Sequence, residues 1–252
     1  MPTPRIGTVD LPERVDRPRY FRELNYLELS ALFPGPLKPS ALARWAAESP
    51  KQSIGLVAPW VLTHRKAPKS TKLWDHDASV GDFRDSAPGR AALAGLVEAV
   101  AALNAPCVVF SSPPLFAPSA ANRELLKRFF GEIATPDVIN AERVWVPDGL
   151  WEPRSAVTFA NELGVTCALD PLVREPGQPP EIYEDLDAQS VYFRVSGLGR
   201  SGTIRTEQLE ELALLVDHYS ESSVTIAFNS PSRWQDARNL TKSLEATLGV
   251  DD

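Results

Sequence analysis

The stretch VYFRVSGLGRSG, residues 191–202, carries the pattern that decides the fold of this 252-residue chain. A short apolar run, Val191–Ser196, ends on a polar residue and passes into a glycine-rich loop. A helical pattern then opens at Thr206. A strand that leads into a helix and then into another strand is the repeating unit of a parallel α/β sheet.

Seven further runs along the chain have the same form. They are Arg5–Thr8, Asn25–Ser30, Ile54–Ala58, Cys107–Ser111, Glu142–Val146, Val165–Asp170 and Val224–Asn229. Eight strands that alternate with helices over roughly 250 residues match a closed barrel. We therefore predict an α/β fold, a parallel eight-stranded (β/α)8 TIM-type barrel, as a single domain over residues 1–252.

The connections between the runs are mostly helical. Helical patterns begin near Ala91, Ser119, Pro153, Thr206 and Ser232. Two connections differ from this pattern. Arg65–Pro88 is long and charged, with Trp74 as its main apolar anchor, and Pro171–Pro180 is rich in proline. We expect the second to be a loop in place of the helix after strand six.

Composition excludes several classes of protein. The net charge is −7 without a long run of like charge, which argues against a general nucleic-acid or membrane-surface binder. No apolar stretch approaches the ~18 residues that span a bilayer, and Met1–Arg5 does not resemble a signal peptide. Cys107 and Cys167 lie inside strand-like runs, so we interpret them as buried thiols in a reducing cytoplasm. Three histidines are too few for an endonuclease-type metal cluster.

Side chains alternate along a strand, so parity separates the barrel interior from the face covered by helices. In Val191–Ser196 the bulky residues share one parity, and Tyr192, Arg194 and Ser196 share the other. By the same reasoning, we expect four polar side chains to point into the barrel interior at its C-terminal end. They are Glu28, Asp170, Arg194 and Asn229. An unpaired charge there would cost several kcal/mol, so these groups either form an ion-pair network or bind a ligand.

Short motifs follow the strand-like runs over nearly the whole chain. They are Glu28, Pro39, Trp45, Thr63-His64, Ser112-Pro113-Pro114-Leu115-Phe116, Trp151, Gly164 with Asp170, Arg194 with Gly197, Phe228-Asn229 and Ala237. In this order and spacing they are similar to the YecE-like barrels, the family called domain of unknown function 72. The resemblance implies a TIM-type barrel and a cytoplasmic protein, and it implies no particular reaction.

The chain differs from that family at several polar positions. Ser30 stands where the family usually has Asn, and Val57 stands where it commonly has Lys. Trp145 and Pro147 replace a Glu and an Arg of strand five, and Ser196 replaces a frequent His. The resemblance therefore implies a divergent member, altered or inactive if the family is catalytic.

The loop after strand seven is a candidate anion site. It contains a G-x-G-x-x-G pattern, which is weak as a dinucleotide fingerprint because no helix starts at its third glycine. Barrels frequently bind phosphate with the backbone N–H groups of the loops after strands seven and eight. The ligand-binding candidates are Ser30, Arg194, Ser196, Gly197, Gly199, Arg200 and Asn229, and Arg233 could add charge. The alternative is a flexible glycine turn with solvated arginines.

Three residues are candidates for acid–base catalysis: Glu28, His64 and Asp170. His64 lies just past strand three, where one neighbouring carboxylate would tune it for proton transfer. The alternative for His64 is a structural histidine that is hydrogen-bonded to backbone and holds the long loop. Asp75-His76-Asp77 resembles a metal motif, but it lies in a polar loop and we interpret it as solvated. We expect neither a metal nor an organic cofactor; the weaker alternative is Mg²⁺ held by the carboxylates of Glu28 and Asp170 alone.

Two functional hypotheses follow from these residues. The first is a metal-independent enzyme, or a descendant of one, that binds a small anionic molecule at the C-terminal barrel mouth. The second is a catalytically inactive barrel that acts as an interaction or scaffold protein, favoured by Val57, Trp145 and Pro147. A protein partner fits the second hypothesis, and neither a membrane nor a nucleic acid is an expected partner.

Overall fold

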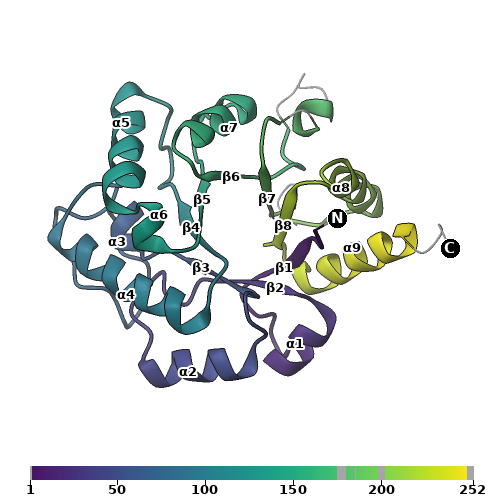
Figure 1. Cartoon of the computed structure of the whole chain (residues 1–252), viewed down its shortest axis with the longest axis horizontal. Helices are drawn as coiled ribbons and strands as arrows, with labels where there is room; N and C mark the ends of the chain where they lie inside the picture. The colour runs from purple at the N-terminus through teal and green to yellow at the C-terminus, as the bar shows by residue number, and fades with distance from the viewer. Residues whose placement is uncertain (1, 175–179, 185, 198–201, 249–252) are drawn as a thin grey trace. The chain divides into compact units, whose positions relative to one another are not determined.

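The computed structural model describes residues 2–174, 180–184, 186–197 and 202–248. Eight parallel strands close into a barrel in the order β1-β2-β3-β4-β5-β6-β7-β8 (Figure 1). They are β1 (Arg5–Val9), β2 (Tyr26–Leu29), β3 (Ile54–Val57), β4 (Cys107–Ser111), β5 (Glu142–Val146), β6 (Thr166–Leu169), β7 (Ser190–Val195) and β8 (Ser223–Phe228). The prediction of an eight-stranded parallel barrel is confirmed.

The chain divides into two compact units. We call Met1–Leu27 with Ala168–Asp252 the terminal unit, and Glu28–Cys167 the central unit. The single domain over residues 1–252 stays a prediction.

Several helices of the central unit begin at a residue whose side chain caps the first turn. The helices of this unit are α2 (Pro39–Glu48), α3 (Trp60–Thr63), α4 (Ala87–Leu103), α5 (Ala120–Arg128), the π-helix η1 (Phe129–Ile133), α6 (Pro136–Ile139) and α7 (Pro153–Glu162). Ser119 caps α5 as predicted, because its hydroxyl accepts the N–H of Asn122. The helix expected from Ala91 starts earlier, because the hydroxyl of Ser86 accepts the N–H of Gly89 at 3.1 Å.

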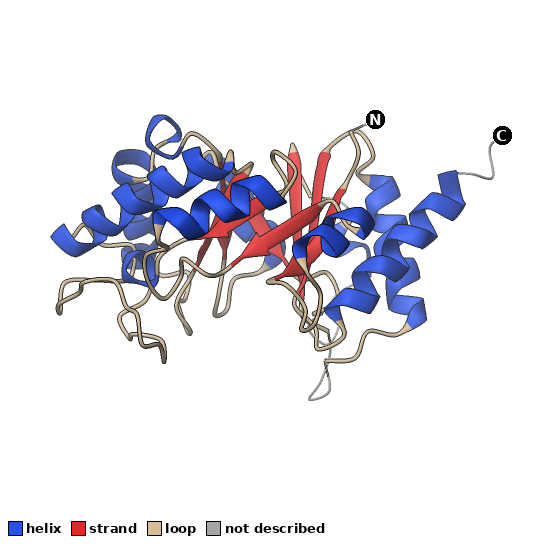
Figure 2. Cartoon of the chain, turned by 90° about the horizontal axis from the view of Figure 1, so that it is seen from below, coloured by secondary structure: helices blue, strands red, loops and turns tan. Residues whose placement is uncertain are grey.

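The terminal unit holds α1 (Arg17–Glu23), the 3₁₀-helix η2 (Pro180–Tyr183), α8 (Thr206–His218) and α9 (Arg233–Leu248). In the described part of the connection between β6 and β7, the chain forms η2 and no α-helix. The prediction of a loop after strand six is therefore confirmed. Within each unit the helices lie outside the strands (Figure 2).

Packing in the terminal unit follows the predicted parity. The ring of Phe193 packs against Tyr219 at the end of α8, with ring centroids 6.3 Å apart. The hydroxyls of Tyr26 and Tyr192, on the opposite parity, lie 2.9 Å apart in a buried hydrogen bond. The hydroxyl of Tyr20 donates to the carbonyl of Tyr26 at 2.6 Å, which fixes α1 against β2. The apolar parity therefore faces the helices.

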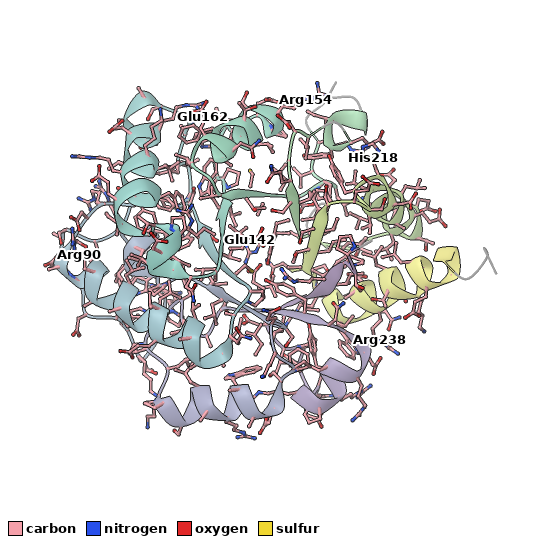
Figure 3. All side chains as sticks on the ribbon, in the orientation of Figure 1. Arg90, Glu142, Arg154, Glu162, His218 and Arg238 are labelled. Carbon is pink, nitrogen blue, oxygen red and sulfur yellow. The ribbon has the colours of Figure 1, made fainter. Side chains whose placement is uncertain are left out.

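Trp74 anchors the long connection in the central unit, as predicted. Its ring is buried, and its Nε1 donates to the carbonyl of Leu32 at 2.8 Å. The charged side chains of Arg90, Arg154 and Glu162 are exposed on the outer helices (Figure 3). Among the described helices, none combines the length and the apolar composition needed to cross a bilayer.

Candidate functional site

Asp170 ties the end of β6 to the end of β7 in the terminal unit. Its Oδ2 accepts the backbone N–H of Ser196 at 2.8 Å, and its Oδ1 accepts that of Leu172 at 3.1 Å. Burial raises the pKa of the Asp170 carboxyl, and the two backbone donors oppose this shift in part. Asp170 therefore fixes the start of the glycine-rich loop, and the N–H of Ser196 already has an acceptor.

The described parts of the glycine-rich loop bring its two ends together. Gly197 has φ +78°, and a Cβ on it would clash with the backbone of Gly202. A Cβ on Gly202 would lie 2.7 Å from Cδ of Pro231, in the turn that leads to α9. The end of the loop after β7 thus packs at Gly202 against the turn after β8. Gly199 and Arg200 lie outside the described residues.

Arg194 lies on β7, and Asn229 directly follows β8. Arg194 is half-buried on β7, in register with Ala227 of β8. The N–H of Asn229 donates to the carbonyl of Val195 at 2.7 Å, which extends the strand pairing beyond β8. The side chains of Asn229 and Ser196 are exposed there. The strand ends β6, β7 and β8 therefore bring Asp170, Arg194, Ser196, Gly197 and Asn229 into one region.

Arg233 contacts a different segment of the terminal unit. Its Nη2 donates to the carbonyl of Leu11 at 3.5 Å, which ties α9 to the segment after β1. Ser230 and Asp236 are both buried and form a short hydroxyl–carboxylate hydrogen bond of 2.5 Å. Burial raises the pKa of Asp236, and the bond from Ser230 opposes the shift. These contacts stabilise the start of α9.

Glu28 and Ser30 belong to the central unit. Glu28 is fully buried on β2, with 0% of its surface exposed, and Ser30 is half-buried just after the strand. A carboxylate at this depth requires compensation by hydrogen bonds or charge. The predicted alternative, an ion-pair network of Arg194 with Glu28 or Asp170, stays a prediction.

His64 ends α3 in the central unit. Its Nδ1 lies 2.7 Å from the hydroxyl of Thr63, and its ring meets Phe33 edge-on with centroids 5.2 Å apart. Burial lowers the pKa of His64, and the negative charges of Asp148 and Asp82 act in the opposite direction. The imidazole is therefore neutral at pH 7 and has two carboxylates within electrostatic range.

A left-handed turn places Asp82 beside His64. Gly81, Asp82 and Phe83 have φ values of +84°, +53° and +58°, and three such residues in succession are uncommon. Their N–H groups donate to the carbonyls of the last turn of α3: Val61 at 2.8 Å, Thr63 at 3.0 Å and Leu62 at 3.0 Å, respectively. Backbone donors therefore fasten this end of the Arg65–Pro88 connection to α3. The side chains of Arg65 and Asp82, both within this connection, also form an ion pair.

Sequence reasoning missed Asp82 and Asp148. Asp148 follows β5 in Pro147-Asp148-Gly149. Polar residues at the ends of predicted strands, such as Asp170, are site candidates, and the same criterion could have found Asp148. Its Oδ1 accepts the N–H of Leu115 at 2.9 Å, which joins the connections after β4 and β5. Asp82 lies far from any strand end in the sequence, and only the left-handed turn brings it to His64.

Tryptophan side chains make the end of β5 apolar. Trp145 is fully buried, and its Nε1 donates to the hydroxyl of Ser112 at 2.8 Å. Trp151 meets Trp145 edge-on at 4.8 Å and stacks on Phe159 at 5.5 Å. Trp60, on α3, is also fully buried. Trp60 and Trp145 are therefore core residues in this structure, and neither of them offers a surface to a partner.

The Asp75-His76-Asp77 segment is exposed. The Oδ1 of Asp77 accepts the N–H of Ser79, and the ring of His76 packs edge-on against Trp60 at 4.9 Å. Over the described residues, no three His, Cys, Asp or Glu side chains gather in a way that could hold a metal ion. Cys107 and Cys167 are buried, as predicted from their strands, and they do not form a disulfide.

Comparison with known proteins identifies relatives by fold. No family model matches the chain, and no curated protein matches it by sequence. A DUF72 family protein from Enterococcus faecalis V583 superposes with a TM-score of 0.70 and 14% identity, over 96% of each chain. A DUF72 family protein from Thermotoga maritima MSB8 gives 0.65 and 14%, over 96% of this chain and 98% of that one.

An endonuclease IV from Thermus thermophilus shares the barrel with a TM-score of 0.54 and 14% identity, over 98% and 99% of the two chains. At these identities the likeness shows the fold alone. The resemblance to the DUF72 barrels that the motifs indicated is confirmed at that level.

Proposed function

We propose that this protein binds a small anionic molecule at the ends of β6, β7 and β8, and that it is an enzyme or a descendant of one. The observation that carries the proposal is the pair of hydrogen bonds from Ser196 and Leu172 to Asp170. These bonds fix the glycine-rich loop at its first residue. Because Ser196 is held in place, the backbone N–H of the neighbouring Gly197 can bind a ligand without a large ordering cost.

The ligand class follows from the groups at these strand ends. The guanidinium of Arg194 matches a phosphate or carboxylate by two parallel hydrogen bonds. Asn229 and Ser196 have exposed side chains that can donate to the same ligand. A small phosphorylated or carboxylated molecule satisfies these donors best.

The proposed chemistry is general acid–base catalysis without a metal. Burial raises the pKa of Asp170, which suits a group that delivers a proton. Burial lowers the pKa of His64, which suits a group that accepts one. Glu28 is the third candidate because it is a fully buried carboxyl on a strand. Hydrolysis, elimination and isomerisation of an anionic substrate all use such groups.

The second candidate function is a catalytically inactive barrel with a protein partner. The end of β5 favours an inactive barrel, because the packed rings of Trp145, Trp151 and Phe159 fill that region and bring no ionisable group. Val57 at the end of β3 is buried and also brings no ionisable group. We place the protein in a reducing compartment such as the cytoplasm in either case, because both cysteines are buried and form no disulfide.

A thermal-shift screen tests the first proposal. The panel contains inorganic phosphate, phosphorylated metabolites, sugars and carboxylates, and the variants are Arg194→Ala and Arg22→Ala. Arg22 is an exposed arginine at the end of α1 in the same unit, so it controls for loss of one positive charge. We expect an anionic ligand to raise the melting temperature of the wild type and of Arg22→Ala but not of Arg194→Ala. A flat panel, or an equal shift in all three proteins, contradicts the anion site.

A further inference from the structure

The outward face of α8 is acidic and carries one exposed leucine. The segment from Thr206 to Ser232 contains five acidic residues and no lysine or arginine. They are Glu207, Glu210, Glu211, Asp217 and Glu221. Leu214 lies among them with 72% of its surface exposed. A single exposed leucine is common on protein surfaces, so the hollows beside Leu214 decide whether this face can bind a partner.

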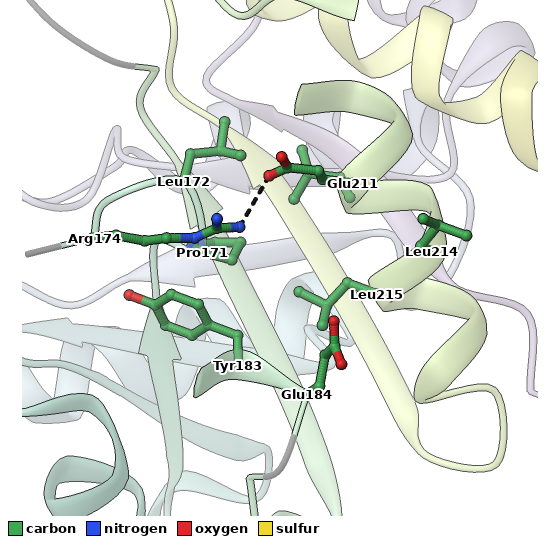
Figure 4. Close-up of a pocket in the computed structure, with 9 residues that line it drawn as sticks. Pro171, Leu172, Arg174, Tyr183, Glu184, Glu211, Leu214 and Leu215 are labelled. Carbon is green, nitrogen blue, oxygen red and sulfur yellow. Dashed lines mark hydrogen bonds and ion pairs between the residues drawn. The ribbon is translucent and has the colours of Figure 1, made fainter. Parts of the chain in front are cut away.

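Two hollows flank α8, and Leu214 lines both of them. The larger has a volume of about 440 Å³ and a mainly apolar lining that includes Pro4, Ala213, Val216 and Leu244. The smaller has a volume of about 130 Å³ and lies on the side of Tyr183 and Leu215 (Figure 4). Leu214 is therefore a ridge between two depressions that apolar side chains of a partner can fill.

The charged residues that line these hollows are mostly acidic. Glu210 and Asp217 are the charged residues that line the larger hollow. In the smaller one, Nη2 of Arg174 is paired with Glu211 at 2.9 Å, and Glu184 adds a further negative charge (Figure 4). A partner that covers Leu214 therefore approaches a negative rim, and complementary charge on it favours association.

We propose that α8 is a docking surface for a basic amphipathic segment of another protein. Its apolar side chains would enter the two hollows on either side of Leu214, and its lysine or arginine side chains would face Glu210 and Asp217. This is the helix-in-groove mode of recognition, in which a row of apolar anchors gives affinity and flanking charges give specificity. A second copy of the same face is disfavoured because two acidic helices repel, and an anionic membrane is disfavoured for the same reason. The inference is independent of the anion site at β6, β7 and β8.

The test uses the full chain and two synthetic 14-residue peptides with leucines at helical spacing. The other positions are lysine in the first peptide and glutamate in the second. Fluorescence anisotropy measures binding to the wild type, Leu214→Ser and Glu210→Lys. The matched controls are Leu150→Ser, at a leucine with 82% exposure in the central unit, and Glu124→Lys on α5. All four changes are on the surface, and melting temperatures verify that each variant is folded.

We expect the lysine peptide to bind and the glutamate peptide to fail. Leu214→Ser and Glu210→Lys should each weaken binding about tenfold, as hot-spot substitutions do, and the controls should leave it unchanged. Absence of binding, or equal binding by the glutamate peptide, would overturn the proposal. So would a loss in Glu210→Lys without a loss in Leu214→Ser, because attraction would then come from charge alone.

Discussion

At the scale of single residues, the imidazole of His64 is a group whose protonation is set by its surroundings. The Thr63 hydroxyl and the Phe33 ring enclose it, and Asp82 and Asp148 act on it electrostatically. Burial is the largest of these influences and favours the neutral ring. A neutral imidazole next to carboxylates is the state that a general base requires before it accepts a proton.

An NMR titration should therefore give His64 a pKa below the ordinary value of about 6.5. Asp148→Asn should lower this pKa further, because the carboxylate favours the imidazolium. Asp75→Asn, at an exposed loop position, should leave it unchanged. The chain has three histidines, so the resonances can be assigned by single substitutions. A His64 pKa above 6.5 would contradict this account.

The same shift has a consequence for stability. In the pH window between the folded and unfolded pKa values of His64, the unfolded chain binds more protons than the folded one. The contribution of His64 to the free energy of unfolding is therefore present above about 6.5 and is lost as the pH falls through the folded pKa. Urea unfolding at several pH values should show this loss in the wild type and not in His64→Gln.

Asp170→Asn tests whether the carboxylate holds the glycine-rich loop. An asparagine has one acceptor oxygen, so one of the two backbone N–H groups of Ser196 and Leu172 loses its partner. We expect the free energy of unfolding to fall by roughly 1–3 kcal/mol. Urea unfolding measures the change, with Asp75→Asn expected within about 0.5 kcal/mol of the wild type. Equal stability of the two variants would show that the Asp170 bonds do not order the loop.

At the scale of elements, the strands could be predicted from sequence more fully than the connections between them. The alternation of bulky apolar and polar residues in Val191–Ser196 predicted both the strand and the face on which Phe193 lies. This was possible because the pattern depends only on neighbouring residues. The start of α4 was placed too late, because the cap at Ser86 lies in a polar segment without apolar periodicity. The left-handed turn at Gly81–Phe83 could not be predicted, because it depends on carbonyls of α3 about twenty residues earlier.

Gly81→Ala should be strongly destabilising. Gly81 has φ +84°, and a Cβ there would clash with the backbone carbonyl of His64. Gly131→Ala is the matched control, since a Cβ at this position in η1 meets no atom within 4 Å. We expect a loss of about 2 kcal/mol or more for Gly81→Ala and no loss for Gly131→Ala, by chemical unfolding. Similar effects of the two substitutions would contradict the described turn.

At the scale of the whole molecule, the closed barrel leads us to expect one cooperative unfolding transition. Five of the six tryptophans lie within Glu28–Cys167, and Trp234 lies in the terminal unit. Tryptophan fluorescence therefore reports mainly on the central unit, whereas far-ultraviolet circular dichroism reports on both. Coincident urea transitions by the two probes are expected for a single domain. Two separated midpoints would show that the units unfold independently.

The candidate site was predictable in part, because parallel strands in a barrel bring their C-terminal ends to one rim. Asp170, Ser196 and Asn229 were found in this way, and the terminal unit holds them at adjacent strand ends. Asp82 was missed because its position depends on a loop conformation. These residues do not identify the ligand, because an arginine beside backbone N–H donors can bind many different anions.

The central claim is that the ends of β6, β7 and β8 form an anion site, and a crystal structure of the protein soaked in inorganic phosphate tests it most directly. We predict density for phosphate between the guanidinium of Arg194 and the backbone N–H of Gly197, and no such density in crystals of Arg194→Ala. Phosphate that binds only elsewhere on the protein, or the same density in the variant, would contradict the claim.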